Sequence, residues 1–141
     1  MKIVVVSGGF DPVHSGHIRL FNAARTYGDY LIVGLNSDGW LQRKKGREFM
    51  PFNERAGIVM NLKAVDEVMS FDDSDGSACD LLHKIRGHYW TKATEFIFAN
   101  GGDRNESNNA EKEVEGYRFV YGVGGSHKKN SSSWLLRAWN E

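Results

Sequence analysis

The sequence has a single cysteine, Cys79, among its 141 residues, so it cannot form an intramolecular disulfide or a cysteine-rich zinc site. It also has no excess of either charge, because 18 basic residues balance 18 acidic ones. Non-specific binding to nucleic acid depends on a basic excess, and this balance therefore disfavours a polynucleotide partner. A local cluster of basic residues can still bind a small anion.

Long hydrophobic runs are missing as well. The apolar run near the N-terminus is far too short for a signal peptide, and no later run is long enough to span a bilayer. We therefore expect a cytoplasmic protein that has no membrane partner. What the sequence does have is a globular balance, with 40% hydrophobic and 26% charged residues, over a length that fits a single domain, residues 1–141.

Short apolar runs alternate with helical patterns along the chain. Lys2–Val6 is rich in β-branched residues and is soon followed by glycines, which is typical of a strand buried on both faces of a parallel sheet. Further strands are predicted over 30–35, 67–71, 96–99 and 118–121, and helices from 15, over 53–65, around 81–85 and from about 132. This order predicts an α/β fold, namely a Rossmann-like five-stranded parallel sheet with helices on both faces.

The clearest chemical signal lies in residues 8–17, Gly-Gly-Phe-Asp-Pro-Val-His-Ser-Gly-His. The two glycines follow a strand, so the backbone can approach a phosphate closely. His14 and His17 lie three residues apart at a helix start, where both imidazoles can point at one anion and the helix N-terminus adds partial positive charge. Nucleotidyl transfer needs such donors where negative charge spreads in the transition state.

This segment resembles the phosphate-binding HxGH segment of the nucleotidyltransferase superfamily. The similarity is to its cytidylyltransferase-like branches, which include glycerol-3-phosphate cytidylyltransferase and the adenylyltransferase domain of bifunctional ADP-heptose synthase. It extends in order along nearly the whole chain, through the segments 28–38, 44–46, 53–55, 65–68, 100–103 and 130–133. The resemblance implies transfer of a nucleoside monophosphate from CTP or ATP to a phosphorylated sugar or polyol. It also implies Mg2+ with the triphosphate, release of pyrophosphate and a homodimer.

The resemblance further implies a set of site residues. His14 and His17 would stabilise the transition state, and Lys44, or Lys45 beside it in a lysine-bearing loop, would neutralise phosphate charge. No side chain is implied as a metal ligand. Further nucleotide contacts are implied for Gly9, Phe10, Gly16, Gly102, Asp103, Arg104, Ser131, Ser132 and Ser133.

Two more charged residues complete this implied set. Asp11 would order the glycine-rich loop or the metal–phosphate assembly, and Arg55 would support binding of the substrate phosphate. Each of these assignments has a plainer alternative. The histidines and serines can simply cap helices, the lysines can form a solvated loop, and Arg55 can form an ordinary helix ion pair.

One segment departs from the family pattern. The family's final signature usually begins with an arginine, whereas here Lys128 and Lys129 precede the serines. Lysine cannot reproduce the bidentate fork of a guanidinium, so the choice between CTP and ATP stays open. A catalytically silent nucleotide-binding or sensing module is the alternative function. Kinship with class I aminoacyl-tRNA synthetases is disfavoured by the short length and neutral charge. Trp134 and Trp139 are expected to be core or interface residues.

Overall fold

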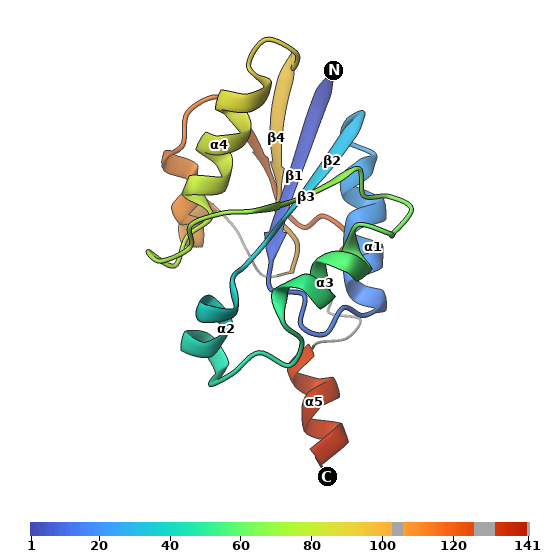
Figure 1. Cartoon of the computed structure of the whole chain (residues 1–141). Coiled ribbons are helices and arrows are strands. Elements are labelled where there is room, and N and C mark those ends of the chain that lie inside the picture. Colours follow the sequence, from blue (N-terminus) through green and yellow to red (C-terminus); the bar gives the residue numbers. More distant parts are fainter. Residues whose placement is uncertain (103–105, 126–131, 141) are drawn as a thin grey trace.

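The computed structural model describes residues 1–102, 106–125 and 132–140, and it contains one parallel sheet of five strands in the order β3–β2–β1–β4–β5 (Figure 1). The strands are β1 (Lys2–Gly8), β2 (Tyr30–Leu35), β3 (Glu67–Ser70), β4 (Glu95–Ala99) and β5 (Tyr117–Val120). The central strand β1 pairs with β2 on one side and β4 on the other, so that Val4 lies opposite both Leu31 and Ile97. The sheet predicted from the apolar runs is confirmed.

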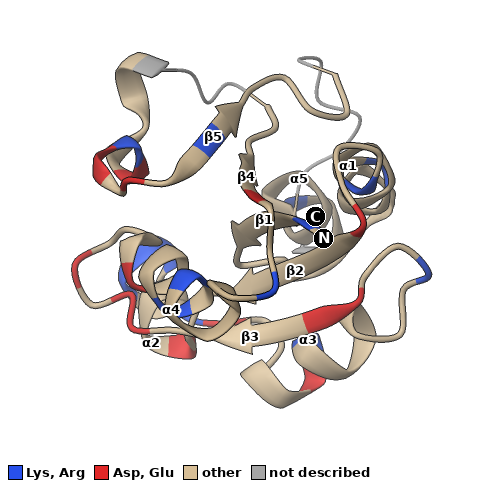
Figure 2. Cartoon of the chain, turned by 90° about the horizontal axis from the view of Figure 1, so that it is seen from above, with Lys and Arg blue, Asp and Glu red and all other residues tan. Residues whose placement is uncertain are grey.

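Helices cover both faces of this sheet (Figures 1 and 2). The helices α1 (Ser15–Arg25) and α3 (Phe52–Val59) pack on one face, and α4 (Cys79–Tyr89) packs on the other. The short helix α2 (Asp38–Lys45) follows β2, and two 3-10 turns, Glu106–Asn108 and Ala110–Glu113, lie between β4 and β5. Among the described residues, none of these helices combines the length and apolarity needed to cross a membrane.

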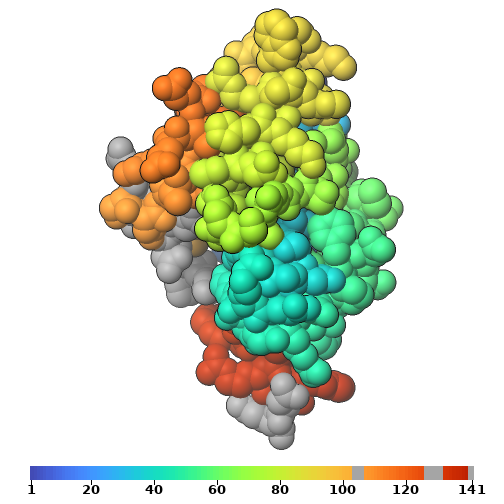
Figure 3. Space-filling model, turned by 60° about the vertical axis from the view of Figure 1, so that its left-hand side comes forward, coloured from blue at the N-terminus to red at the C-terminus, as the bar shows by residue number. Residues whose placement is uncertain are grey.

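The last helix, α5 (Ser132–Asn140), extends away from the sheet (Figure 1). In the space-filling view it lies at the same end of the molecule as α2 (Figure 3). Trp134 is 48% exposed and Trp139 is 84% exposed. A core position for these two tryptophans is therefore wrong, because α5 does not pack on the sheet.

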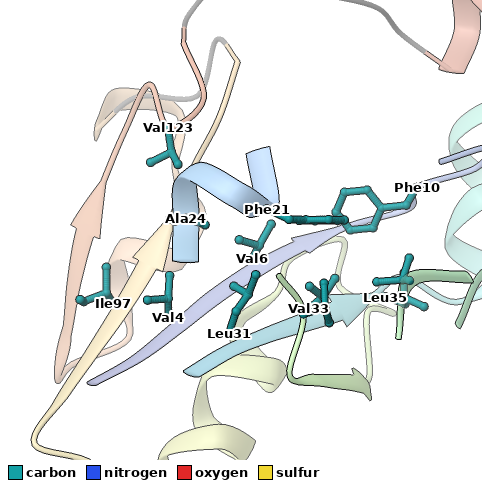
Figure 4. Packing of buried hydrophobic residues seen from close by; sticks show 13 residues of the cluster. Val4, Val6, Phe10, Phe21, Ala24, Leu31, Val33, Leu35, Ile97 and Val123 are labelled. Carbon is teal, nitrogen blue, oxygen red and sulfur yellow. The ribbon is translucent and has the colours of Figure 1, made fainter. Parts of the chain in front are cut away.

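The core explains why β1 and β2 are continuous apolar runs. Alternate residues of each strand belong to the cluster under α1, where Phe21 and Ala24 pack against Val4 and Val6 (Figure 4). The intervening residues belong to the cluster under α4. Burial of each aliphatic side chain stabilises the folded chain by about 1.5–3 kcal/mol. Burial on both faces therefore stabilises the sheet that carries the site.

Two details differ from the prediction. The lysine-bearing segment that was expected to be a polar loop contains the second half of α2. Ser37 caps the start of this helix by accepting a hydrogen bond from the Trp40 amide at 3.1 Å. Helix α3 ends at Val59 instead of continuing to Val65. Leu62 and Val65 still pack against the core, but turns with hydrogen bonds to the third preceding residue bring them there.

Candidate active site

A cavity of about 460 Å³ opens beyond the carboxyl ends of β1 and β4. The sheet order reverses between these two strands, since the chain continues from β1 towards β2 and β3 on one side and uses β4 and β5 on the other. Open α/β sheets bind their ligands at such a switch point. The position of the cavity thus follows from the topology.

Ten of the residues predicted for the site line this cavity. They are Gly9, Phe10, Asp11, His14, Gly16, His17, Lys44, Gly102, Ser132 and Ser133. Lys45, the alternative to Lys44, lines it too. Asp103, Arg104 and Ser131 lie outside the described residues. Arg55 does not line the cavity.

His14 and His17 are held in fixed orientations at the start of α1. His14 is the N-cap residue, and its Nδ1 accepts a hydrogen bond from the Gly16 amide at 3.0 Å. The Nδ1 of His17 accepts one from the His14 amide at 3.2 Å. The two rings stack, with centroids 3.8 Å apart. Because both Nδ1 atoms accept, each neutral ring carries its proton on Nε2 and can donate it to a ligand.

The environment of His17 disfavours a positive charge on its ring. Burial, and then the nearby His14, lower the pKa of His17 from 6.5 to about 3. The Phe10 ring packs edge-on against the His17 ring at 4.8 Å between centroids, which contributes to this burial. At neutral pH the His17 imidazole is thus a neutral hydrogen-bond donor whose position is set before any ligand arrives.

Asp11 ties the glycine-rich loop to the segment between α2 and α3. Its carboxylate accepts hydrogen bonds from the Phe49 and Met50 amides at 2.6 Å each, and Lys45 Nζ lies 3.2 Å from Asp11 Oδ2. The Asp11 side chain is almost fully buried. A buried carboxylate that accepts charge-assisted hydrogen bonds from two amides fixes both chain segments relative to each other.

Arg55 lies beneath the site and is fully buried. Its guanidinium donates to the carbonyl oxygens of Gly9, Asn36 and Met50 at 2.8–2.9 Å, and to Asp38 Oδ1 at 2.6 Å. These bonds join the ends of β1 and β2 to α2 and to the start of α3. The structure therefore gives Arg55 contacts with the protein itself in place of the expected contact with a substrate phosphate.

Lys44 and Trp40 form one side of the cavity from α2. They are one helical turn apart, and Lys44 Nζ lies 4.6 Å from the centroid of the Trp40 ring. A cation–π contact of this kind limits where the ammonium group can lie. Trp40 was not predicted, because its helix was not predicted.

The opposite side of the cavity comes from residues far apart in the sequence. Gly101 and Gly102 follow β4, Val123 to Gly125 follow β5, and α5 contributes its first turn. Ser132 Oγ donates to the Pro12 carbonyl at 2.7 Å, which fastens the start of α5 to the glycine-rich loop.

Arg19, Leu20 and Asn100 also line the cavity and were not predicted as site residues. Arg19 and Leu20 follow His17 on α1, and the HxGH pattern by itself gives no sign of them. Asn100 follows β4 directly, a position where a site residue is expected. Among the described residues no group of three or more histidine, cysteine or acidic side chains could hold a metal ion.

Comparison with known proteins places these features in a family. Residues 5–133 match the family model described as Cytidylyltransferase-like. The bifunctional protein HldE of Geobacter metallireducens is 33% identical over 147 residues, which cover 99% of this chain and 28% of that protein. HldE of Campylobacter curvus is 40% identical over 98 residues, covering 67% of this chain and 20% of that protein. The chain thus spans less than a third of these relatives.

Solved structures share the fold. The lipopolysaccharide core biosynthesis protein from Thermoplasma volcanium aligns with a TM-score of 0.64 at 22% identity, over 86% of this chain and 95% of that one. A bifunctional NMN adenylyltransferase/ADP ribose pyrophosphatase from Francisella tularensis, complexed with AMP and Mn ion, aligns with a TM-score of 0.70 at 15% identity, over 99% of this chain and 42% of that one. Because the family model matches most of the sequence, this chain belongs to the cytidylyltransferase-like family of nucleotidyltransferases.

Proposed function

We propose that this chain transfers a nucleoside monophosphate from CTP or ATP to the phosphate group of a sugar or polyol and releases pyrophosphate. The observation that carries the proposal is the stacked pair of His14 and His17 at the N-terminus of α1, on the wall of the cavity. Family membership supplies the class of reaction, and the geometry supports assigning it to this cavity.

In the proposed reaction, a phosphate oxygen of the acceptor attacks the α-phosphorus of the triphosphate. A new P–O bond forms there while the bond to the bridging oxygen of the β-phosphate breaks, and pyrophosphate leaves with the electron pair. The Nε2–H groups of His14 and His17 donate to the α-phosphate as negative charge spreads over it. Preorganised donors of this kind are commonly the largest contribution to such catalysis.

The cations of the cavity suit this chemistry. Arg19, Lys44 and Lys45 line it, and Asp11 is the single carboxylate among its described lining residues. We assign Lys44 to the acceptor phosphate. We assign Asp11 and Arg55 to positioning, because their hydrogen bonds hold the backbone around Gly9. Nucleotide contacts by Asp103, Arg104 and Ser131 stay predictions.

We further propose that Mg2+ enters with the triphosphate, where it would neutralise phosphate charge. The carboxylate of Asp11 already accepts from two amides and pairs with Lys45, so the protein groups present fit a metal held by phosphate oxygens. With this assignment phosphate oxygens, and not protein side chains, would be the ligands of the metal ion.

The similarity to HldE proteins, which covers only part of their length, favours a sugar phosphate as the acceptor. We propose that residues 1–141 act as one domain and that two copies pair through the exposed apolar residues of α5, namely Trp134, Leu135 and Trp139. Light scattering during size-exclusion chromatography checks the pairing, and a monomer at working concentration would contradict it.

Two measurements test the function. Scanning fluorimetry with CTP or ATP, each with Mg2+, should show that one of them raises the melting temperature, because a ligand that binds only the folded state stabilises it. Pyrophosphate release from pairs of that triphosphate with sugar and polyol phosphates then identifies the acceptor. If neither triphosphate shifted the transition, the assignment to nucleotides would be wrong. Binding without turnover with any acceptor would favour the silent module.

A further inference from the structure

The cavity contains a guanidinium group, that of Arg19, which has no part in the roles proposed for His14, His17 and Lys44. Arg19 follows His17 by two residues on α1, is largely exposed and lines the cavity. Within residues 1–102, 106–125 and 132–140, its guanidinium forms no ion pair and donates no hydrogen bond. A guanidinium carries five donors and a permanent charge, so this one is available to an anion.

The two lysines of the cavity are engaged in ways that Arg19 is not. Lys45 pairs with Asp11, and Lys44 lies over the Trp40 ring. The stacked histidines add donors, but His17 stays neutral at pH 7 because its pKa is about 3. A triphosphate brings several negative charges into this space. Besides Mg2+ entering with the triphosphate, Lys44 and Arg19 are described side chains of the cavity that can contribute compensating positive charge.

Arg19 lies on the side of the cavity formed by the loop after β5. A Cβ atom on Gly125 would come within 2.9 Å of Arg19 Nη2, and Gly125 has a φ of +95° that disfavours any other residue. The loop therefore leaves room for the guanidinium directly against its backbone. The first turn of α5, with Ser132 and Ser133, lines the same cavity. Lys44 belongs to α2, which follows β2. Strand β2 lies on the opposite side of β1 from β5 and its loop.

This arrangement suits an in-line displacement, in which the attacking and leaving groups lie on opposite sides of the α-phosphorus. We propose that Arg19 binds the β- and γ-phosphates of the nucleoside triphosphate and stabilises pyrophosphate as it leaves, while Lys44 faces the acceptor phosphate. The inference rests on the function proposed above and assigns the leaving-group side of that site. A planar guanidinium can contact two phosphate oxygens at once, and these contacts strengthen as negative charge develops on the leaving group.

The test uses the full chain with Arg19→Met and Arg19→Lys, and with Arg118→Met as a control. Arg118 is an exposed arginine of β5 that pairs with Glu95 and does not line the cavity, so the control removes the same charge elsewhere. Calorimetry measures binding of the triphosphate, of the corresponding monophosphate and of inorganic pyrophosphate. Steady-state kinetics gives kcat and the KM of the acceptor.

We expect Arg19→Met to weaken triphosphate and pyrophosphate binding about 10- to 100-fold, the effect of losing one charged hydrogen-bonding group. Monophosphate binding and the KM of the acceptor should stay within about twofold of wild type, and kcat should fall. Arg19→Lys should recover part of the binding, because it keeps the charge without the fork. Arg118→Met should match wild type.

Equal binding of triphosphate and pyrophosphate by wild type and Arg19→Met would overturn the inference and leave the proposed function intact. A loss of monophosphate binding as large as that of triphosphate would also overturn it, since Arg19 would then serve the nucleoside or the α-phosphate. If the wild-type chain bound no triphosphate at all, both the inference and the proposed function would fail.

Discussion

The imidazole rings of His14 and His17 stack with their planes 27° from parallel, and each ring is held by a backbone amide that donates to its Nδ1. The first of these amides belongs to Gly16 and the second to His14 itself. The pair therefore forms one rigid unit, because any tilt of one ring disturbs the hydrogen bond or the stacking of the other. Its two Nε2–H donors are set before a ligand binds.

Removal of either ring should reduce catalysis far more than stability. We expect His14→Ala or His17→Ala to lower kcat by about 100- to 1,000-fold, as for the loss of one preorganised donor to a transition state. Pyrophosphate release measures this effect, and circular dichroism verifies the fold. Wild-type turnover in one variant would remove that histidine from the mechanism.

The low pKa of His17 predicts a pH dependence of stability. In the folded chain the pKa is about 3, whereas the ordinary value is 6.5. Between these pH values the unfolded chain binds a proton that the folded chain does not, so this residue destabilises the fold as the pH falls below 6.5. Urea unfolding of His17→Gln and wild type, at pH 7 and at pH 5, checks this.

The free energy of unfolding of wild type should fall relative to that of His17→Gln by roughly 1 kcal/mol per pH unit within this window. Parallel curves for the two proteins would show that His17 titrates normally in the folded chain. Saturating triphosphate should lessen the pH dependence, because phosphate charge favours the protonated ring.

Arg55 should be needed for stability. Arg55→Met leaves the buried carbonyl oxygens of Gly9, Asn36 and Met50 without their hydrogen-bond donor. We expect this change to lower the free energy of unfolding by about 3–5 kcal/mol. Arg43→Met is the matched control, because the Arg43 side chain is 54% exposed and lies 3.8 Å from the Asp73 carboxylate. We expect Arg43→Met to lower the free energy of unfolding by about 1 kcal/mol or less. Urea unfolding compares the two, and equal losses would contradict the distinction.

Asp11 should control the order of the segment between α2 and α3. In Asp11→Asn an amide nitrogen replaces one oxygen and cannot accept from the Phe49 or Met50 amide. We expect faster hydrogen exchange at these two amides and a higher KM for the triphosphate. Asp29→Asn is a control, since its carboxylate accepts from the Lys2 amide and does not line the cavity. Unchanged exchange in Asp11→Asn would show that the loop is held by other contacts.

Trp40 should affect binding of the acceptor through its contact with Lys44. Trp40→Leu removes the ring beneath the ammonium group, and we expect the KM of the acceptor to rise about two- to tenfold, in line with one cation–π contact. Trp40→Phe keeps a ring and should recover much of this loss. In a Lys44→Met background the Trp40→Leu change should have little further effect. Additive effects in that double variant would separate the two residues.

The sequence was sufficient for the sheet and for the placement of His14 and His17 together. Strands such as β1 and β2 are buried on both faces, so their apolar runs stand out, and the spacing of His14 and His17 predicts that both rings lie at one helix start. Phosphate binding there stays a prediction. Helix α2 was missed because Leu41 is its sole buried residue, which leaves no apolar period to detect. The position of Arg55 was missed because its partners Gly9 and Asn36 are close only after β1 and β2 pair.

The hydrogen bond from Ser132 to Pro12 joins residues 120 positions apart. During synthesis the first strand and its histidines emerge early, but the strand β4 that completes the sheet beside β1, and the helix that closes the far wall, emerge much later. The wall of the cavity that Ser132 completes can therefore assemble only after residues 12 and 132 have both been synthesised.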